Sequence, residues 1–222
     1  MRRYLYILLI STILNAELIA QNTQFSLATD IGVLRSFKKE QRFLTFGHTI
    51  QGVFHVAPKD ALYVWISYYK NGKFDNDLTA TAKSGLTIPQ EVKYKNKASM
   101  RLRQLSMGWK RYLKGTYDNE DRYNIYGYAG LGLLFGRMTN QHSTVIDTAQ
   151  YDLPVLSGEK AFKRLTLDLG LGVEQPIGNA LFLYVEGRAW IPASDYPSKY
   201  LFVNDNAPVM GMINAGIRIL FD

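Results

Sequence analysis

The sequence predicts an all-β protein, specifically an eight-stranded antiparallel up-and-down transmembrane β-barrel. Eight segments alternate apolar and polar residues with the period of two that a strand requires. The connections between these segments alternate between short and long. An N-terminal export signal is followed by no apolar run of about 20 residues, the length of a transmembrane helix. A closed barrel is the other way for a backbone to cross a bilayer with its polar groups satisfied.

Residues 1–20 are predicted to be a signal peptide that is removed on export. Arg2 and Arg3 precede an apolar stretch from residue 5 to residue 14, and the segment closes at Ala20. Positive charge, a short apolar core and a small residue in this order are typical of a secretory signal. Leu18 is larger than the residue preferred three positions before the cut, and a buried first helix is the alternative interpretation. Residues 21–222 are predicted to form a single outer-membrane β-barrel domain.

The composition excludes several classes of protein. The chain has no cysteine, so we expect no lipoprotein anchor, disulfide framework or thiol chemistry. Removal of Arg2, Arg3 and Glu17 takes the formal charge from +7 to +6 (7 − 2 + 1). This excess is spread along the chain without a basic run interleaved with aromatic residues, which argues against nucleic-acid binding. Contact with anionic lipid head groups is the simpler explanation of the net positive charge.

The clearest strand is predicted at Arg164–Glu174. Its apolar row consists of Leu165, Leu167, Leu169, Leu171 and Val173. Its other face is polar and contains glycine. A helix would scatter these leucines around its circumference, whereas a strand places them on one side.

Seven further segments complete the predicted barrel. They are Phe25–Val33, Arg42–Val56, Leu62–Lys70, Met100–Leu113, Tyr123–Gly136, Ala180–Ile191 and Val209–Phe221. Two patterns are less regular. His48 falls in the apolar row of its segment, and Arg101 and Arg103 share the parity of apolar residues. We expect these two arginines to lie at the membrane edge.

The connections predict which end of the barrel is elaborated. Residues 57–60 and 175–179 form short turns, and residues 114–121 form an intermediate one. Longer polar loops are predicted at Asn71–Lys97, Met138–Ala161 and Pro192–Pro208. Only the hairpin at residues 37–41 departs from this alternation. Short periplasmic turns and longer outer loops are typical of transmembrane barrels, and an even strand number places both termini on the periplasmic side.

The polar faces indicate that the apolar faces point outward. These faces carry charges of both signs, which a narrow lumen can hold as paired, hydrogen-bonded groups. The predicted luminal polar network consists of Asp30, Arg164, Asp168, Glu174, Glu186, Arg188 and Arg218. Glycines also recur there, as expected for a crowded and strongly curved wall: Gly32, Gly130, Gly132, Gly170, Gly172 and Gly216. A soluble lipocalin-type barrel, with the apolar face inside, is the alternative.

The C-terminal strand carries a resemblance to a known family. Its sequence NAGIRILFD, with Phe221 next to the end, resembles the signal recognised by the barrel assembly machinery, although Asp222 follows the aromatic residue. Together with GYAGLGLLFG and LDLGLGVEQPIGNALFLYVEGRAW, it makes the mature chain resemble small OmpA-like and porin-like barrel proteins, especially those of Bacteroidetes. The resemblance implies a bacterial outer-membrane location and contact with outer-membrane lipids. It includes no catalytic signature.

Sequence motifs for chemistry are weak. His48, His55 and His142 lack metal-ligand spacing, and we expect no metal or other cofactor. His142 precedes Ser143, and Asp147 follows in the same polar segment. Catalysis would need these groups to converge in the fold, so a solvated loop is the simpler interpretation. Closely spaced glycines are not followed by the helix that a phosphate-binding loop requires.

We therefore expect a non-enzymatic barrel with a structural or loop-mediated interaction role in the cell envelope and a lumen plugged by polar side chains. The candidate loop contacts are Tyr94, Tyr151, Tyr196 and Tyr200. Three alternatives stay open: a lipid-modifying barrel enzyme with His142 as base, a narrow pore, and a soluble exported ligand-binding barrel. A surface or periplasmic protein partner cannot be named from the sequence.

Overall fold

The computed structural model describes residues 24–178, 180–193 and 208–221. The predicted signal peptide, Tyr196 and Tyr200 lie outside these ranges. Within them, no helix has the length and apolar character needed to cross a membrane.

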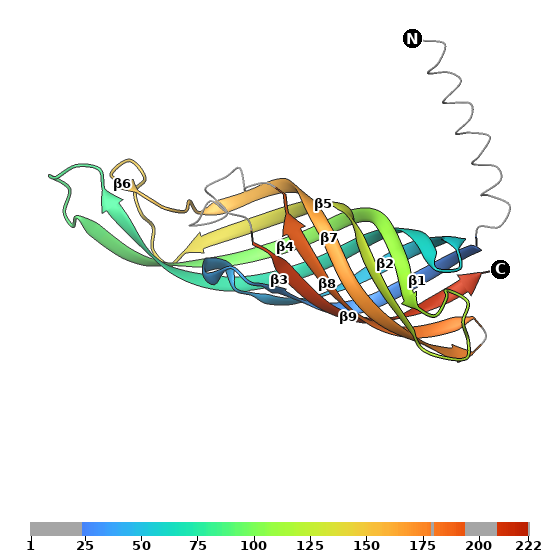
Figure 1. Cartoon of the computed structure of the whole chain (residues 1–222). Helices are drawn as coiled ribbons and strands as arrows, with labels where there is room; N and C mark the ends of the chain where they lie inside the picture. Colours follow the sequence, from blue (N-terminus) through green and yellow to red (C-terminus); the bar gives the residue numbers. More distant parts are fainter. Residues whose placement is uncertain (1–23, 179, 194–207, 222) are drawn as a thin grey trace, which may run out of the picture.

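Eight long antiparallel strands form a closed ring, as the sequence predicts. The elements are β1 (Gln24–Ser36), η1 (Lys39–Gln41), β2 (Leu44–Ala57), β3 (Asp60–Ala82), β4 (Glu91–Lys114), β5 (Asn124–His142), β6 (Tyr151–Asp152), β7 (Gly158–Gly178), β8 (Leu181–Pro192) and β9 (Met210–Phe221). The ring runs β1–β2–β3–β4–β5–β7–β8–β9 and closes between β9 and β1. The two-residue strand β6 pairs only with the end of β3. We call the end where β1 begins and β9 finishes the terminal end, and the opposite end the loop end (Figure 1).

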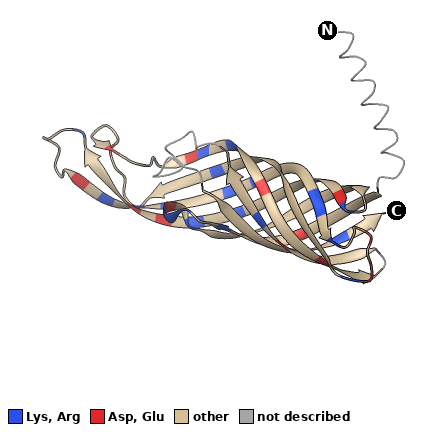
Figure 2. Cartoon of the chain, in the orientation of Figure 1, with Lys and Arg blue, Asp and Glu red and all other residues tan. Residues whose placement is uncertain are grey.

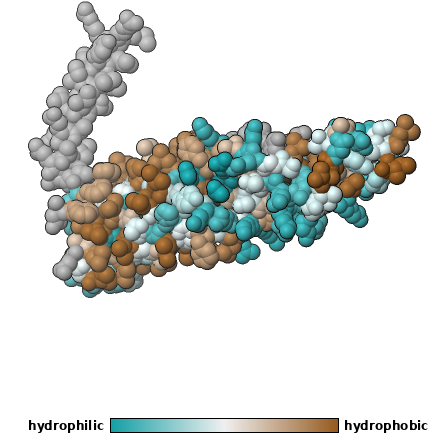
Figure 3. Space-filling view, turned by 180° about the vertical axis from the view of Figure 1, so that it is seen from behind, coloured by the Kyte–Doolittle hydropathy of each residue, from teal (hydrophilic) through white to brown (hydrophobic). Residues whose placement is uncertain are grey.

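The apolar rows face outward and the polar rows face inward. Ile31, in the apolar row of β1, is 74% exposed, whereas its neighbour Asp30 is 3% exposed. The predicted leucine row of β7 is likewise exposed. On the face seen in Figure 3, hydrophobic side chains predominate over the terminal half, and hydrophilic ones predominate beyond it. The alternative of a soluble barrel with an apolar interior is therefore wrong. We call this exterior the apolar belt.

Four strands continue past the apolar belt at the loop end. β3, β4, β5 and β7 contain 23, 24, 19 and 21 residues, whereas the other ring strands contain 12 to 14. Together with the chain between β5 and β7, the parts beyond the belt form what we call the extension. The extension projects from one side of the barrel (Figure 1).

The predicted loop at Asn71–Lys97 is wrong for most of its length, because only residues 83–90 connect β3 and β4. The strand pairing shifts between Tyr69 and Gly72, and Asn71 has a positive φ of 61°. A bulge of this kind changes which parity faces inward, so the alternation in the sequence is interrupted although the strand continues. Polar residues on the outside of the extension add to the loop-like composition.

The predicted loop at Met138–Ala161 is also longer than the observed connection, whereas the one at Pro192–Pro208 nearly coincides with the connection between β8 and β9. In the segment Met138–Ala161, β5 continues to its last residue, His142, and β7 begins at Gly158. Pro192 is the last residue of β8, and most of the connection to β9 lies outside the described residues. The predicted alternation is confirmed only in part, because the turn at residues 115–123 of the terminal end is longer than the loop-end connections at residues 37–43 and 83–90.

Inward-facing glycines leave room for aromatic rings from the next strand. Gly170 and Gly172 of β7 pair with Tyr128 and Tyr126 of β5, and each ring covers the glycine opposite it. A side chain at either glycine would occupy the position of the ring. These glycines therefore allow large side chains to fold flat against a narrow, curved wall.

Candidate functional site

The middle of the barrel interior contains a cluster centred on Arg188. Its guanidinium donates hydrogen bonds to Asp30 Oδ2 at 2.7 Å and to Thr49 Oγ1 at 3.0 Å, and it also pairs with Glu186. Tyr184 donates to the same Asp30 oxygen at 3.0 Å. All five side chains are buried. One cation thus lies between two carboxylates that come from β1 and β8.

A second cluster, centred on Glu174, lies nearer the terminal end. Arg218 donates to both carboxylate oxygens of Glu174, at 3.1 and 2.7 Å, and Lys110 Nζ lies 3.6 Å from one of them. Arg218 also donates to Ser26 Oγ at 2.9 Å, which links β9 to β1. Here one carboxylate is shared by two buried cations. The two clusters have opposite charge excesses along the barrel axis.

A third group of luminal side chains is centred on Asp168, whose hydrogen-bond partners are uncharged. Its Oδ1 accepts hydrogen bonds from Gln104 Nε2 and Thr166 Oγ1, both at 2.8 Å. Trp65 Nε1 donates to Gln104 Oε1 at 3.2 Å. Arg164 is buried on the same strand as Asp168. The structure therefore places all seven residues of the predicted luminal network inside the barrel.

An apolar cluster occupies the interior closer to the loop end. It contains Leu34, Phe43, Tyr69, Phe74, Ala98, Met100, Leu102, Leu134, Met138, Phe162, Trp190, Met210 and Met212. The prediction of a polar lumen is therefore incomplete, because the inward rows become apolar toward the loop end. Lys110, Thr49 and Tyr184 of the charged clusters were also missed. Their inward parity in the strand pattern was the signal that could have identified them.

The extension has a small core of its own. Leu78, Ala80, Tyr94, Tyr151 and Val155 are buried together there. β6 adds a third strand beside β3 and β4. A two-stranded hairpin is at best marginally stable in water, whereas a third strand and an apolar face allow independent stability. The extension is therefore an ordered unit.

The turn that ends the β3–β4 hairpin is fixed by side-chain hydrogen bonds. Gln90 Nε2 donates to the carbonyl oxygens of Ser84, Gly85 and Thr87 at 3.3, 3.0 and 2.7 Å. Tyr151 OH donates to the Pro89 carbonyl at 2.9 Å, so the neighbouring connection supports the same turn. The backbone at the tip of the extension is thus held by hydrogen bonds from the β3–β4 turn itself and from the connection between β5 and β7.

Two of the predicted loop contacts have a different role. Tyr94 is 4% exposed and Tyr151 is 8% exposed, so both pack inside the extension and are not free for a partner. Tyr94 lies on β4, and Tyr151 begins β6. Their prediction as loop contacts is wrong because the polar segments around them form strands whose inner face is apolar. Leu86 and Ile88, which the sequence pattern did not single out, are large apolar side chains exposed at the tip.

His142 does not form a catalytic arrangement with its neighbours. Its ring packs against Tyr94, with the ring centres 4.7 Å apart. Ser143 Oγ accepts the backbone N–H of Lys95 at 3.0 Å, and Asp147 Oδ1 accepts that of Ala149 at 2.8 Å. Both groups that could assist a histidine are therefore engaged by the backbone.

Acidification is expected to loosen the connection between β5 and β7. Burial lowers the pKa of His142 from its usual 6.5, and the hydrogen bond to the Val155 backbone offsets only part of this effect. Because the folded loop disfavours the protonated ring, its stability is complete above pH 6.5 and is lost as the pH falls below that value. Hydrogen exchange across residues 143–157 at pH 8 and pH 5, corrected for intrinsic rates, measures the effect.

The variant His142→Phe is the control for this pH effect. It keeps an aromatic ring against Tyr94 but cannot be protonated, so its loop protection should not depend on pH. Equal protection of the wild-type loop at both pH values would contradict the prediction.

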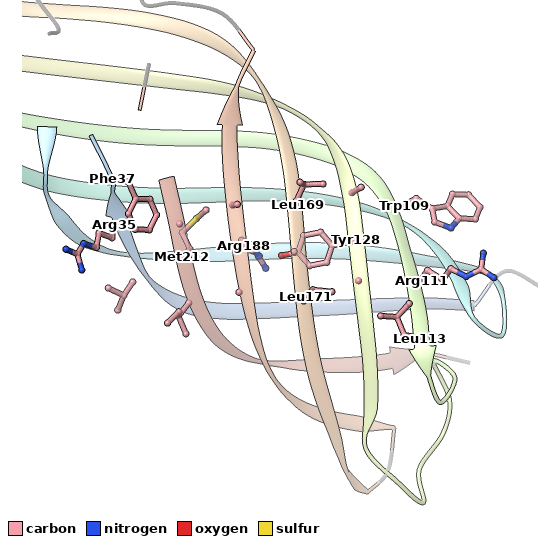
Figure 4. Close-up of a pocket in the computed structure, with 18 of the residues that line it drawn as sticks. Arg35, Phe37, Trp109, Arg111, Leu113, Tyr128, Leu169, Leu171, Arg188 and Met212 are labelled. Carbon is pink, nitrogen blue, oxygen red and sulfur yellow. The ribbon is translucent and has the colours of Figure 1, made fainter. Parts of the chain in front are cut away.

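A shallow apolar groove of about 1060 Å³ crosses the outer face of the barrel. Arg35 and Phe37 lie at one end of it, and Trp109, Arg111 and Leu113 lie at the other (Figure 4). Small outward residues form its floor: Gly127, Ala129, Gly187, Ala189 and Gly211. The groove lies within the apolar belt and is part of the surface that faces lipid chains. Among the described residues, no group of His, Asp or Glu side chains is placed to hold a metal ion.

Comparisons with known proteins agree on the fold. No protein-family model matches the sequence, and no curated protein matches it either. The crystal structure of Neisserial surface protein A is similar, with a TM-score of 0.58 and 13% identity over 89% of this chain and 97% of that one. A major outer membrane protein from Thermus thermophilus has a TM-score of 0.52 and 13% identity, covering 90% of this chain and all of the other.

A third similar structure is that of Ail, the attachment invasion locus protein of Yersinia pestis, in complex with the heparin analogue sucrose octasulfate. It has a TM-score of 0.51 and 10% identity over 90% of this chain and 99% of that one. The predicted resemblance to small outer-membrane β-barrel proteins is thus confirmed at the level of the fold. An outer-membrane location agrees with this fold and with the apolar belt. The Bacteroidetes type stays a prediction, as does the role of Phe221, which pairs with Phe25 at the closure of the barrel.

Proposed function

We propose that the protein is a non-enzymatic outer-membrane barrel that presents its extension as a contact surface outside the cell. The terminal end is then periplasmic and the loop end extracellular, as in transmembrane barrels generally. The observation that carries the proposal is the ordered extension, which has its own core and a fixed turn at its tip. A loop that served only to connect two strands would need neither.

The tip of the extension has the character of a protein contact. Leu86 and Ile88 are 93% and 90% exposed, and they lie in the turn that the Gln90 amide fixes. Hydrophobic side chains are visible at this far end of the molecule (Figure 3). Apolar residues held out in solvent by an ordered support are typical of interaction sites. Preorganisation of this kind lowers the entropy lost on binding.

An apolar partner that binds the tip is favoured over a polyanion that binds the sides of the extension. Ail, which is similar in fold, has been solved with a heparin analogue. In this chain Lys95 and Lys97 of β4 pair in register with Asp77 and Asp75 of β3, and Lys95 forms an ion pair with Asp77 at 3.8 Å. These carboxylates reduce the positive potential that a sulfated saccharide would need.

Replacement of the apolar tip should abolish surface contact without unfolding the barrel. We expect cells that display the double variant Leu86→Ser, Ile88→Ser to adhere at least tenfold less than cells with the wild-type protein, because about 2–3 kcal/mol of apolar burial per side chain is removed from the interface. The measurement counts cells bound to fixed bacterial and animal cell layers at matched surface display.

The matched control is the double variant Thr139→Ser, Gln141→Ser, which changes exposed residues on β5 of the same extension. It should adhere like the wild type. Equal adhesion of the tip variant and the wild type would contradict the proposal. Wild-type adhesion no greater than that of cells without the protein would contradict it as well.

We further propose that the lumen does not conduct. Charged clusters and an apolar cluster follow one another along the interior, and eight strands enclose a space just wide enough for side chains. Planar-bilayer recordings of the refolded protein should show no conductance steps above the lipid baseline. Reproducible steps that depend on Glu186 and Arg188 would favour the narrow pore instead.

The lipid-modifying enzyme is the weaker alternative. His142 lies five residues beyond Arg137, a residue at the edge of the apolar belt, which corresponds to about 16 Å along the strand. A lipid ester at the membrane surface would be out of reach of this ring. Ser143 Oγ and Asp147 Oδ1 accept hydrogen bonds from backbone N–H groups, and the His142 ring contacts Tyr94 and the Val155 backbone.

A further inference from the structure

Four cations lie side by side on the outer face where the apolar belt ends. Arg101 and Arg103 are on β4, Arg137 is on β5, and Lys163 is on β7. In the strand register, Arg101 lies opposite Arg137, and both Arg103 and Lys163 lie opposite Phe135. Figure 2 shows Lys and Arg recurring midway along the molecule, between the two ends. We call these four residues the cation cluster.

The cluster is directly above a row of leucines. Leu105, Leu133 and Leu165 are paired across the same three strands, two residues closer to the terminal end. All three point outward, as do the four cations. Two residues of strand correspond to about 7 Å, so the charged groups begin where the lipid-facing row stops. A head group and its acyl chains would meet these two rows in that order.

The cation cluster has fewer carboxylates than cations, so its positive charge is not neutralised within the cluster. Arg137 forms an ion pair with Glu159, but no carboxylate of the described residues lies within ion-pair distance of Arg101, Arg103 or Lys163. Four cations and one carboxylate leave a local charge of +3 (4 − 1). Like charges directly opposite each other across two strands are destabilising, and Arg101 faces Arg137 in this way. An external anion would relieve that repulsion.

Aromatic rings hold two of the cations in place. Arg103 lies over the ring of Tyr68, 5.4 Å from its centre, and Lys163 lies over Phe135 at 5.8 Å. Tyr68, Arg103, Phe135 and Lys163 therefore form a continuous row across four strands. Aromatic residues at this level are typical of the membrane interface. The stems of the cations lie on apolar surface while their charged ends stay at its edge.

We propose that the cation cluster binds the phosphorylated head groups of lipids in the outer leaflet. Arginine matches phosphate in geometry as well as charge, because its planar guanidinium can donate two parallel hydrogen bonds. Immediate continuity with the leucine row favours a lipid over a soluble anion, since only a lipid meets both rows. Of the lysines farther out on β4, Lys95 and Lys97 face aspartates of β3, so the cation cluster is the stronger anion site.

The test compares lipid binding by two triple variants in nanodiscs. Arg101→Gln, Arg103→Gln, Lys163→Gln removes three charges from the cluster, and Lys93→Gln, Lys95→Gln, Lys97→Gln removes three from the outer part of β4. The probe is lipid A, a bis-phosphorylated acyl glycolipid, with its dephosphorylated form as comparison. At about 1 kcal/mol per basic residue near a membrane surface, the cluster variant should bind lipid A roughly a hundredfold more weakly. The β4 control should bind like the wild type.

The controls distinguish lipid phosphate from free phosphate, and a loss of charge in the cluster from a general loss of positive charge or of folding. Inorganic phosphate at a thousandfold excess should not displace lipid A, and displacement would contradict a lipid site. Equal binding of the two lipid forms, or an equal loss in both variants, would also overturn the proposal. All substitutions are on the exposed face, and heat-dependent gel migration verifies that each variant is folded before binding is measured.

Discussion

The variant Arg188→Met is expected to lose about 3–5 kcal/mol of stability, the cost of leaving a buried charge without its partner. Arg188 lies between Asp30 and Glu186, and removal of the guanidinium leaves two carboxylates facing each other inside the barrel. Small domains are stable by about 5–15 kcal/mol, so the loss is a large fraction of the free energy of unfolding. Urea titration, with heat-dependent migration on a denaturing gel as the measure of folding, gives the change.

A triple variant separates charge from packing at this site. Asp30→Asn and Glu186→Gln added to Arg188→Met remove the two uncompensated carboxylates and should recover at least half of the lost stability. The exposed Arg42→Met should change stability by less than about 0.5 kcal/mol. An Arg188→Met protein that unfolds at the wild-type urea concentration would show that the cluster contributes nothing to stability.

The variant Gly108→Ala is expected to disrupt the pairing of β4 with β5. Gly108 lies opposite Gly130, and an added Cβ would be 2.5 Å from the Gly130 Cα and still closer to the Ala129 carbonyl oxygen. Tyr63 OH, 2.6 Å away, blocks the inner side. Overpacking typically costs about 1–3 kcal/mol, and here the obstacle is backbone in a closed ring that cannot move apart easily. The yield of refolded, heat-shifted protein and its urea midpoint should both fall.

Gly187→Ala is the matched control for this substitution. Gly187 lies on the outer face of β8, and the nearest atom to its added Cβ, the Met212 carbonyl oxygen, is 4.0 Å away. This variant should fold like the wild type. If both alanine variants fold equally well, the close approach of β4 and β5 is not what requires glycine at position 108.

The local pattern of the chain predicts the barrel wall well. Alternation of apolar and polar residues is a property of neighbouring residues, so it correctly assigns the outward leucines of β7 and the inward Asp168. It fails at Asn71, where one bulge reverses the parity and makes the rest of β3 look like a loop. Tyr94 and Tyr151 of the extension were misassigned because the polar segments around them form strands whose inner face is apolar. Tyr94 belongs to a strand whose inner face packs on β6, a strand too short to detect in sequence.

The sequence by itself determines the number of ring strands, the outward direction of the apolar rows and the set of charged residues that must be inside. Only the tertiary structure decides how those charges are paired, because most of the partners come from strands far apart in the chain. Arg218 meets Ser26, 192 residues away, only when the ring closes between β9 and β1. It also decides that four cations on three strands form one cluster at the membrane edge. The alternation along a strand establishes which face of the barrel a residue occupies, whereas the register between strands establishes which residues are its neighbours.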